Sequence, residues 1–103
     1  MKTLLIIPAY NEEDNIINVI NEIKKNCPSV DYLVVNDCST DGTVEKLKSI
    51  NANYVSCPSN LGIGGAVQTG YRYAYENDYD IAIQIDGDGQ HAKIILARLT
   101  MLK

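Results

Sequence analysis

Thr3-Leu4-Leu5-Ile6-Ile7-Pro8 is a short apolar run that ends at a proline, near the start of a chain of 103 residues. An apolar run of this length without alternation is typical of a strand buried on both faces of a parallel sheet. Tyr32-Leu33-Val34-Val35 has the same character and predicts a second strand over residues 31–36. Residues 53–56 predict a weak third strand, and the alternating stretch Asp80-Ile81-Ala82-Ile83-Gln84-Ile85 predicts the fourth.

Helical patterns separate these strands. Asn11 is expected to cap a first helix, whose first turn is acidic and whose apolar residues recur at helical spacing. A second helix is expected after the turn at residues 39–43, and a third opens from the glycine-rich loop at 58–65 and runs to about Glu76. Residues 93–102 predict a last amphipathic helix.

Strands that alternate with helices of this length imply right-handed crossovers and a parallel sheet. The predicted fold class is therefore α/β, with a mostly parallel sheet of about four strands and helices on both faces. A chain of 103 residues is expected to form one domain, residues 1–103. Because it contains no Trp or Phe, its core must be built from Ile, Leu and Val.

The composition disfavours several classes of function. Nine Lys and Arg against 13 Asp and Glu give a net charge of -4, which leaves no basic surface for nucleic acid. Three widely spaced cysteines and one histidine disfavour a zinc site and a disulfide scaffold. No apolar run approaches the roughly 20 residues of a membrane-spanning helix, and no signal peptide is recognisable, so we expect a cytoplasmic protein.

Polar side chains follow the predicted strands where each one ends. Tyr10, Asn11 and Glu12 come after the first strand, Asp37 after the second, and Asp86 and Asp88 after the fourth. Ligands of open α/β sheets bind at the carboxyl ends of the strands. An acid at the position of Asp37 can accept hydrogen bonds from a ribose hydroxyl or a base N–H. The alternative for Asp37 is a turn or helix cap, a role that we assign to Asp41 instead.

Asp86-Gly87-Asp88 places two carboxylates two residues apart. In an extended backbone both project to the same side, and the glycine between them lets a ligand approach. Such a pair can hold Mg²⁺ or Mn²⁺ together with water and phosphate oxygens. The alternative is that Asp-Gly-Asp-Gly forms a simple turn, although its place at a strand end favours metal binding.

Gly62-Ile63-Gly64 resembles a weakened dinucleotide fingerprint, with two glycines before a helix. The fingerprint belongs after the first strand, however, where this chain has Pro8-Ala9-Tyr10-Asn11-Glu12-Glu13. The acids of that loop would repel a pyrophosphate. A dinucleotide cofactor is therefore not expected.

Four motifs together are more specific than any one of them. In chain order they are Ile6-Ile7-Pro8-Ala9-Tyr10-Asn11-Glu12-Glu13, Val34-Val35-Asn36-Asp37-Cys38-Ser39-Thr40-Asp41-Gly42-Thr43, Asn60-Leu61-Gly62-Ile63-Gly64-Gly65-Ala66 and Asp86-Gly87-Asp88-Gly89-Gln90-His91. This order strongly resembles the family 2 glycosyltransferases. Within the family it is most similar to the dolichyl-phosphate mannosyltransferase and polyprenyl-phosphate glycosyltransferase branch, and the resemblance extends from Lys2 to His91.

The resemblance implies the Rossmann-like nucleotide-binding half of a GT-A fold. It also implies metal-dependent transfer of a sugar from a UDP- or GDP-sugar, with inversion and with a polyprenyl phosphate as acceptor. The residues that it assigns to the nucleotide are Pro8, Tyr10, Glu12, Asp37, Asp86 and Gly87. The residues that it assigns to the Mg²⁺ or Mn²⁺ ion are Asp86, Asp88 and Gln90.

Two departures from the family pattern are visible. Ala92-Lys93-Ile94 follows His91 directly, where related sequences commonly have a proline. Family catalytic domains also continue further, into the part that binds the acceptor and supplies a general base, and no catalytic base is identified here. We therefore expect a truncated domain, the donor-binding half of an enzyme that works in the cytoplasm or at the membrane surface.

Two alternatives remain open at this point. The first is a nucleotide-sugar-binding or regulatory module without turnover. The second, a nucleotidyltransferase acting on sugar phosphates, is disfavoured by Glu12-Glu13, because it would need a basic, glycine-rich loop after the first strand. We also expect self-association as a dimer, since an open sheet of this kind leaves an apolar flank.

Overall fold

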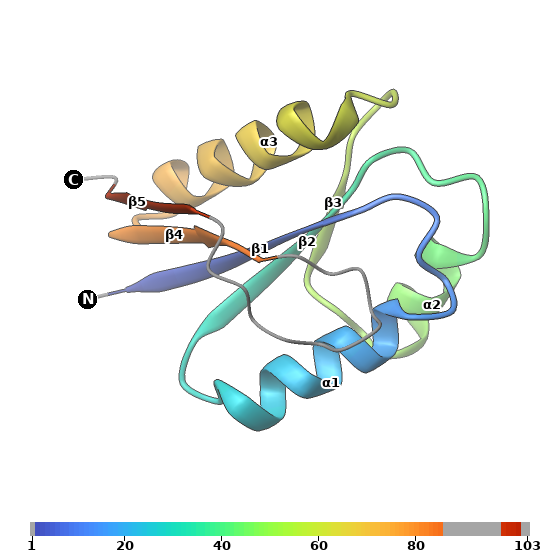
Figure 1. The fold of residues 1–103 in the computed structure, drawn as a ribbon, viewed down its shortest axis with the longest axis horizontal. Coiled ribbons are helices and arrows are strands. Elements are labelled where there is room, and N and C mark those ends of the chain that lie inside the picture. The colour runs from blue at the N-terminus through green and yellow to red at the C-terminus, as the bar shows by residue number, and fades with distance from the viewer. Residues whose placement is uncertain (1, 86–97, 102–103) are drawn as a thin grey trace.

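The computed structural model describes residues 2–85 and 98–101. Within these ranges it has five strands and three helices (Figure 1). In chain order they are β1 (Thr3–Ala9), α1 (Ile16–Asn26), β2 (Asp31–Asn36), α2 (Thr43–Ser49), β3 (Tyr54–Ser56), α3 (Gly62–Glu76), β4 (Ile81–Gln84) and β5 (Arg98–Met101). None of the described helices is long and apolar enough to cross a membrane.

The five strands form one sheet in the order β3-β2-β1-β4-β5. β1 lies in the middle and pairs in parallel with β2 and with β4, and β2 pairs in parallel with β3. β5 is antiparallel to β4. The prediction of an α/β fold with a mostly parallel sheet is confirmed.

The prediction of a helix at residues 93–102 is wrong for residues 98–101, the part of that range that the structure describes. Residues 98–101 form β5, with Arg98 opposite Gln84 and Met101 opposite Ile81. The backbone groups along this edge of β4 gain hydrogen-bond partners when β5 pairs there, and this pairing outweighs the helical spacing of the apolar residues. Residues 93–97 lie outside the described ranges.

The helices cover both faces of the sheet: α1 and α2 lie on one face and α3 on the other (Figure 1). Successive side chains of a strand point to opposite faces, so each central strand contributes side chains to two hydrophobic cores. The core under α1 and α2 contains Leu5, Ile7, Val34, Ile16 and Ile20. The core under α3 contains Leu4, Ile6, Leu33, Val35 and Ala66. This two-sided burial explains why β1 and β2 are continuous apolar runs.

β1 runs two residues further than predicted, through Pro8 to Ala9. Alternate residues of β1 bond to opposite neighbours: Ile6 O accepts the Ile85 amide on the β4 side, and Ala9 O accepts the Asp37 amide on the β2 side. Pro8 therefore faces the β4 side, beyond the Ile6–Ile85 bond, the last one there among the described residues. Its missing amide thus removes no bond of the described β1–β4 pairing.

α1 begins at Ile16 instead of at Asn11, so the predicted cap is wrong. Asn11 has a φ of 53°, in the left-handed region, and cannot lead directly into a helix. Residues 12–15 instead form a turn in which Glu12 O accepts the amides of Asn15 and Ile16. The acidic residues therefore precede α1, whose first turn contains none.

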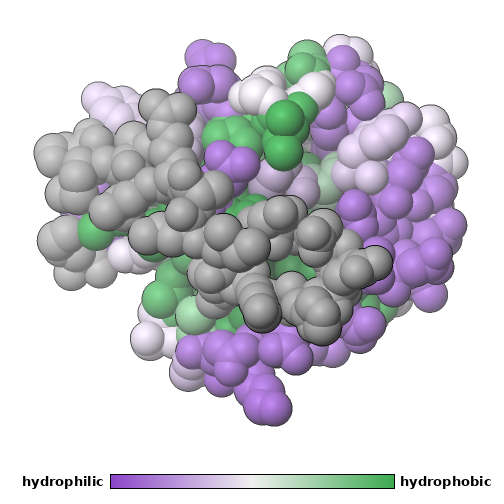
Figure 2. All heavy atoms as spheres, in the orientation of Figure 1, coloured by the Kyte–Doolittle hydropathy of each residue, from purple (hydrophilic) through white to green (hydrophobic). Residues whose placement is uncertain are grey.

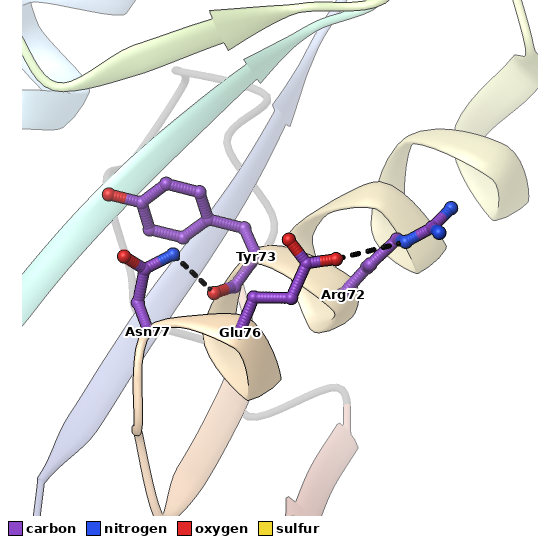
Figure 3. Close-up of polar contacts among 4 residues, drawn as sticks. All are labelled: Arg72, Tyr73, Glu76 and Asn77. Carbon is purple, nitrogen blue, oxygen red and sulfur yellow. Dashed lines mark hydrogen bonds and ion pairs between the residues drawn. The ribbon is translucent and has the colours of Figure 1, made fainter.

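α3 packs closely on the sheet and ends in a polar network. A Cβ built on Gly70 would lie 2.5 Å from Ile6 Cγ2, so the helix approaches β1 more closely there than a larger residue allows. At the other end, Asn77 Nδ2 donates to Tyr73 O at 2.8 Å, and Arg72 Nε lies 3.1 Å from Glu76 Oε1 (Figure 3). That ion pair is exposed and contributes little to stability.

Candidate functional site

The sheet has its topological switch point at β1. The chain proceeds from β1 to β2 and β3 on one side and then returns to β4 on the other. In open α/β sheets, ligands bind at the carboxyl ends of the strands at such a point. The segments that leave these ends are residues 10–15 after β1, 37–42 after β2, 57–61 after β3, and the chain beyond Ile85 after β4. We call this side of the molecule the carboxyl edge.

Three predicted nucleotide-binding residues lie together where β1 ends. Pro8 is half-buried near the end of β1. Tyr10 is the first residue after the strand, and 47% of its surface is exposed. Glu12 is half-buried, its amide donates to Thr43 Oγ1 at 2.9 Å, and its carboxylate accepts from Asn15 Nδ2 at 3.3 Å. The backbone of Glu12 is thus held by the first residue of α2.

Asp37 is the most buried of the predicted site residues, with 4% of its surface exposed. Its amide donates to Ala9 O at 2.8 Å, which joins the ends of β1 and β2. Its carboxylate accepts the amide of Leu61 at 2.7 Å on Oδ1 and that of Gly62 at 2.9 Å on Oδ2. Asp37 therefore caps α3, although each carboxylate oxygen keeps a second lone pair that can accept a ligand hydrogen bond.

Asp41 has the turn role that the sequence predicted. Its Oδ1 accepts the amide of Thr43, two residues on, at 2.9 Å, and its Oδ2 accepts the amide of Glu13 at 3.3 Å. Burial raises the pKa of Asp41, but the hydrogen bonds from Thr43 and Glu13 outweigh it and hold the pKa below its ordinary value. A charged Asp41 therefore ties the segment after β2 to the segment after β1.

The described part of the carboxyl edge is acidic. Residues 9–15, 37–42 and 57–62 include five carboxylates and neither lysine nor arginine. Figure 2 shows hydrophilic side chains gathered over the end of the molecule that holds α2 and these segments. An anion such as a diphosphate would need a cation to bind here.

The predicted metal ligands Asp86, Asp88 and Gln90, and Gly87 with them, lie outside the described residues. Up to Ile85, however, the chain is held beside β1, because the Ile85 amide donates to Ile6 O at 3.0 Å. Asp86 is the next residue. Among residues 2–85 and 98–101, no group of three or more His, Cys, Asp or Glu side chains could hold a metal ion.

Sequence reasoning missed two features of this edge. The first is the contact made by Asn11, which was placed at this edge but whose side-chain oxygen bonds to the segment after β2. The signal was an asparagine in an otherwise acidic turn, a residue type that tolerates left-handed backbone. The second is the apolar rim at the start of α3, where Leu61 is 47% exposed and Ile63 is 69% exposed. Nothing in the sequence indicates which apolar residues of that segment remain uncovered.

Comparison with known proteins agrees with the fold and the motifs. The model of glycosyl transferase family 2 matches residues 4–100. The polyprenol monophosphomannose synthase of Mycolicibacterium smegmatis is 35% identical over an alignment that covers 95% of this chain and 39% of the relative. The chain thus spans about two fifths of the length of the curated relatives it matches first.

Two solved structures share the fold. The mannosyltransferase of Pyrobaculum calidifontis, solved with GDP-Man and Mn²⁺, has a TM-score of 0.74 at 24% identity and is matched over 84% of this chain and 27% of its own. Glucosyl-3-phosphoglycerate synthase of Mycobacterium tuberculosis, solved with Mn²⁺, UDP and glucosyl-3-phosphoglycerate, has a TM-score of 0.67 at 30% identity, over 84% of this chain and 33% of its own. The GT-A fold is confirmed, and the chain belongs to glycosyl transferase family 2.

Proposed function

We propose that the chain is the donor-binding half of an inverting, metal-dependent glycosyltransferase that takes a UDP- or GDP-sugar. A polyprenyl phosphate is the proposed acceptor, supported by the name of the 35% identical mycobacterial relative. Pro8, Tyr10, Glu12 and Asp37 are the proposed nucleotide contacts, with Asp86 and Gly87 completing the set. The observation that carries the proposal is the acidic carboxyl edge, on which the described nucleotide candidates gather.

The occupied start of α3 supports a role for a metal ion. In dinucleotide-binding folds, the pyrophosphate sits on free amides at a helix N-terminus. Here the amides of Leu61 and Gly62 already donate to the buried Asp37 carboxylate. These two amides are therefore not free for a diphosphate, and no lysine or arginine lies in the segments 9–15, 37–42 and 57–62 to supply positive charge.

Asp86, Asp88 and Gln90 would hold that ion, because carboxylate and amide oxygens are the donors that Mg²⁺ and Mn²⁺ take. When bound, the ion would stabilise negative charge on the departing nucleoside diphosphate. Asp37 would accept a hydrogen bond from the base or ribose, using the lone pairs that the α3 amides leave open. The structure of glucosyl-3-phosphoglycerate synthase, which was solved with both UDP and Mn²⁺, supports this pairing of nucleotide and metal.

The test is a thermal shift titration with UDP, GDP and their sugar conjugates, each with and without Mn²⁺. A ligand at a hundred times its Kd stabilises a protein by about 2.7 kcal/mol, which corresponds to a shift of roughly 10 °C for a domain of this size. We expect one nucleotide to stabilise the native chain only with the metal, and Asp88→Asn to abolish the shift. Asp78→Asn, the same change in the loop before β4, is the matched control and should keep it.

A second measurement separates transfer from binding. Release of nucleoside diphosphate from the sugar conjugate, in the presence of a polyprenyl phosphate, would identify a transferase. Metal-dependent binding without release would favour the alternative, a nucleotide-sugar-binding module without turnover. No stabilisation by any nucleotide would contradict both.

A further inference from the structure

Asn11 stands between two of the proposed nucleotide contacts, Tyr10 and Glu12, and is itself exposed. Its φ of 53° is in the left-handed region, which asparagine enters more readily than most residues. The chain therefore turns sharply at Asn11 instead of continuing into α1. This turn brings the Asn11 side chain to the segment that follows β2.

Four hydrogen bonds join Asn11 to that segment, one of them a long bond of 3.4 Å from Thr40 Oγ1 to Asn11 Oδ1. Its Oδ1 accepts the amide of Thr40 at 2.8 Å and the amide of Asp41 at 3.3 Å. Its own amide donates to Ser39 Oγ at 3.0 Å. A single residue thus satisfies backbone and side-chain groups that lie 28 to 30 positions later in the sequence.

These contacts link the two halves of the proposed nucleotide site. Tyr10 and Glu12 belong to the segment after β1, and Asp37 begins the segment after β2. Asp37 and Asp41 also bond to the first segment, at Ala9 and Glu13, but among the described residues it is Asn11 that holds Ser39 and Thr40 between them. Without the Asn11 contacts, this part of the second segment could move independently of Tyr10, and a nucleotide would have to order both on binding, which weakens its affinity. With the link, the two segments hold their relative position before any ligand arrives.

We propose that Asn11 is a positioning residue that preorganises the nucleotide site by clamping the segment after β1 to the segment after β2. This role rests on the proposed function. Asn11 need not touch the nucleotide, since its side-chain oxygen is engaged by the protein's own amides. The clamp has two separable parts, the left-handed backbone and the acceptor oxygen.

Three variants separate these parts. Asn11→Gly keeps the left-handed backbone and removes the acceptor, and Asn11→Asp keeps an acceptor oxygen. Asn51→Gly is the matched control: Asn51 also has a φ of 53° and is exposed, but it lies between α2 and β3, at the opposite edge of the sheet. Among the described residues, the Asn51 side chain makes no hydrogen bond comparable with those of Asn11.

Two readouts are measured on every variant of the full chain. Solvent exchange of the Thr40 and Asp41 amides, followed by NMR, reports the clamp without any ligand. Titration calorimetry with UDP and with GDP, in the presence of Mn²⁺, gives the nucleotide Kd. We expect Asn11→Gly to speed exchange of both amides and to weaken nucleotide binding, each about tenfold, the scale of one lost hydrogen bond. Asn11→Asp should restore slow exchange, and Asn51→Gly should change neither readout.

The two readouts distinguish failure of the inference from failure of the proposed function. Unchanged exchange in Asn11→Gly would overturn the clamp, whether or not a nucleotide binds. Faster exchange with an unchanged Kd would overturn the positioning role. A native chain that binds neither nucleotide would overturn the proposed function and the positioning role with it, while the exchange rates would still decide whether Asn11 joins the two segments.

Discussion

The Asp37 carboxylate holds the first residue of α3, because its Oδ2 accepts the amide of Gly62 at 2.9 Å while its Oδ1 accepts the preceding amide. Hydrogen bonds to charged groups are each worth roughly 1.5–3 kcal/mol, but Asn60 Oδ1 also accepts the Gly62 amide, at 3.1 Å, and would offset part of the loss at that amide. We therefore expect Asp37→Ala to lower the free energy of unfolding by about 2–3 kcal/mol. Asp37→Asn, which keeps one acceptor oxygen, should cost less.

Urea denaturation measures these differences. Asp14→Ala is the control, since Asp14 is exposed in the neighbouring turn and should change stability by less than about 0.5 kcal/mol. If Asp37→Ala were as stable as Asp14→Ala, the carboxylate would not be capping the helix in solution.

A second prediction concerns the contact between Gly70 and Ile6. A Cβ at Gly70 would lie 2.5 Å from Ile6 Cγ2 and 3.0 Å from two further carbons of the same side chain. Overpacking of this kind costs about 1–3 kcal/mol, so Gly70→Ala should destabilise the protein even though alanine favours a helix. Gly64→Ala is the matched change in α3, and nothing lies within 4 Å of a Cβ there.

Chemical denaturation measures the free energy of unfolding of both glycine variants, and the two are expected to differ from the native chain in different directions. Gly64→Ala should be neutral or more stable than the native chain, by up to about 1 kcal/mol. Equal behaviour of the two variants would show that α3 can shift away from β1 at little cost.

The central strands were predictable because both faces of the sheet are covered, so that their side chains are buried on either side. Leu4 and Ile7 point to opposite faces of β1, and both faces are covered, so the run must be apolar throughout. Glycine and proline marked the loops between them. The strand at residues 98–101 was not predictable, because an edge strand depends on the partner beside it, and its own residues had helical spacing.

The ends of the predicted strands indicated candidate site residues, but the sequence did not indicate the hydrogen-bond partners of those residues. Asp37 was expected to bind a ligand, and the structure adds that its carboxylate caps a helix 24 residues further on. Asn11 was expected to cap α1 and instead joins two loops. Both are side-chain to backbone contacts across the fold, which leave no periodic trace in a sequence. The metal ligands stay a prediction.

A third prediction is a pH dependence of stability from Tyr79. Burial raises the pKa of Tyr79 to about 12, aided by the hydrogen bond of 2.7 Å that its hydroxyl donates to Asp31. The folded pKa lies above the ordinary value of 10.0, so the protonated phenol stabilises the fold. This contribution is complete below about pH 10 and is lost as the pH rises toward 12.

Comparison of the native chain with Tyr79→Phe isolates this contribution. The difference in unfolding free energy should be about 1–2 kcal/mol at pH 8, after allowance for solvent screening, and should shrink between pH 10 and 12. Tyr75→Phe is the control, since Tyr75 is 62% exposed. A difference that stays constant up to pH 12 would contradict the shifted pKa.

A fourth prediction is a pH dependence of stability at acidic pH that arises from Asp41. The pKa of Asp41 lies below its ordinary value of 3.8, so its charged form stabilises the fold above that pH, and the contribution is lost as the pH falls. Asp41→Asn keeps an acceptor oxygen but no charge, so at pH 6 it should lower the unfolding free energy by less than the roughly 1 kcal/mol that loss of a cap costs. The deficit should shrink as urea denaturation is repeated below pH 3.8, because the unfolded native chain then takes up a proton at Asp41 before the folded chain does.

The last prediction uses Cys38 as a reporter of the proposed nucleotide site. Cys38 is exposed and follows Asp37 directly, whereas Cys27 is half-buried and Cys57 is buried. A disulfide reagent such as dithionitrobenzoate should therefore modify Cys38 first, and Cys38→Ser should remove the fast phase. A nucleotide held at Asp37 would cover the neighbouring thiol, so UDP or GDP with Mn²⁺ should slow the fast phase.

The slow phases from the other thiols serve as the internal control, because a bound nucleotide should leave them unchanged apart from any general stabilisation. Nucleotide binding, measured separately, that leaves the Cys38 rate unaltered would mean that the nucleotide binds away from Asp37.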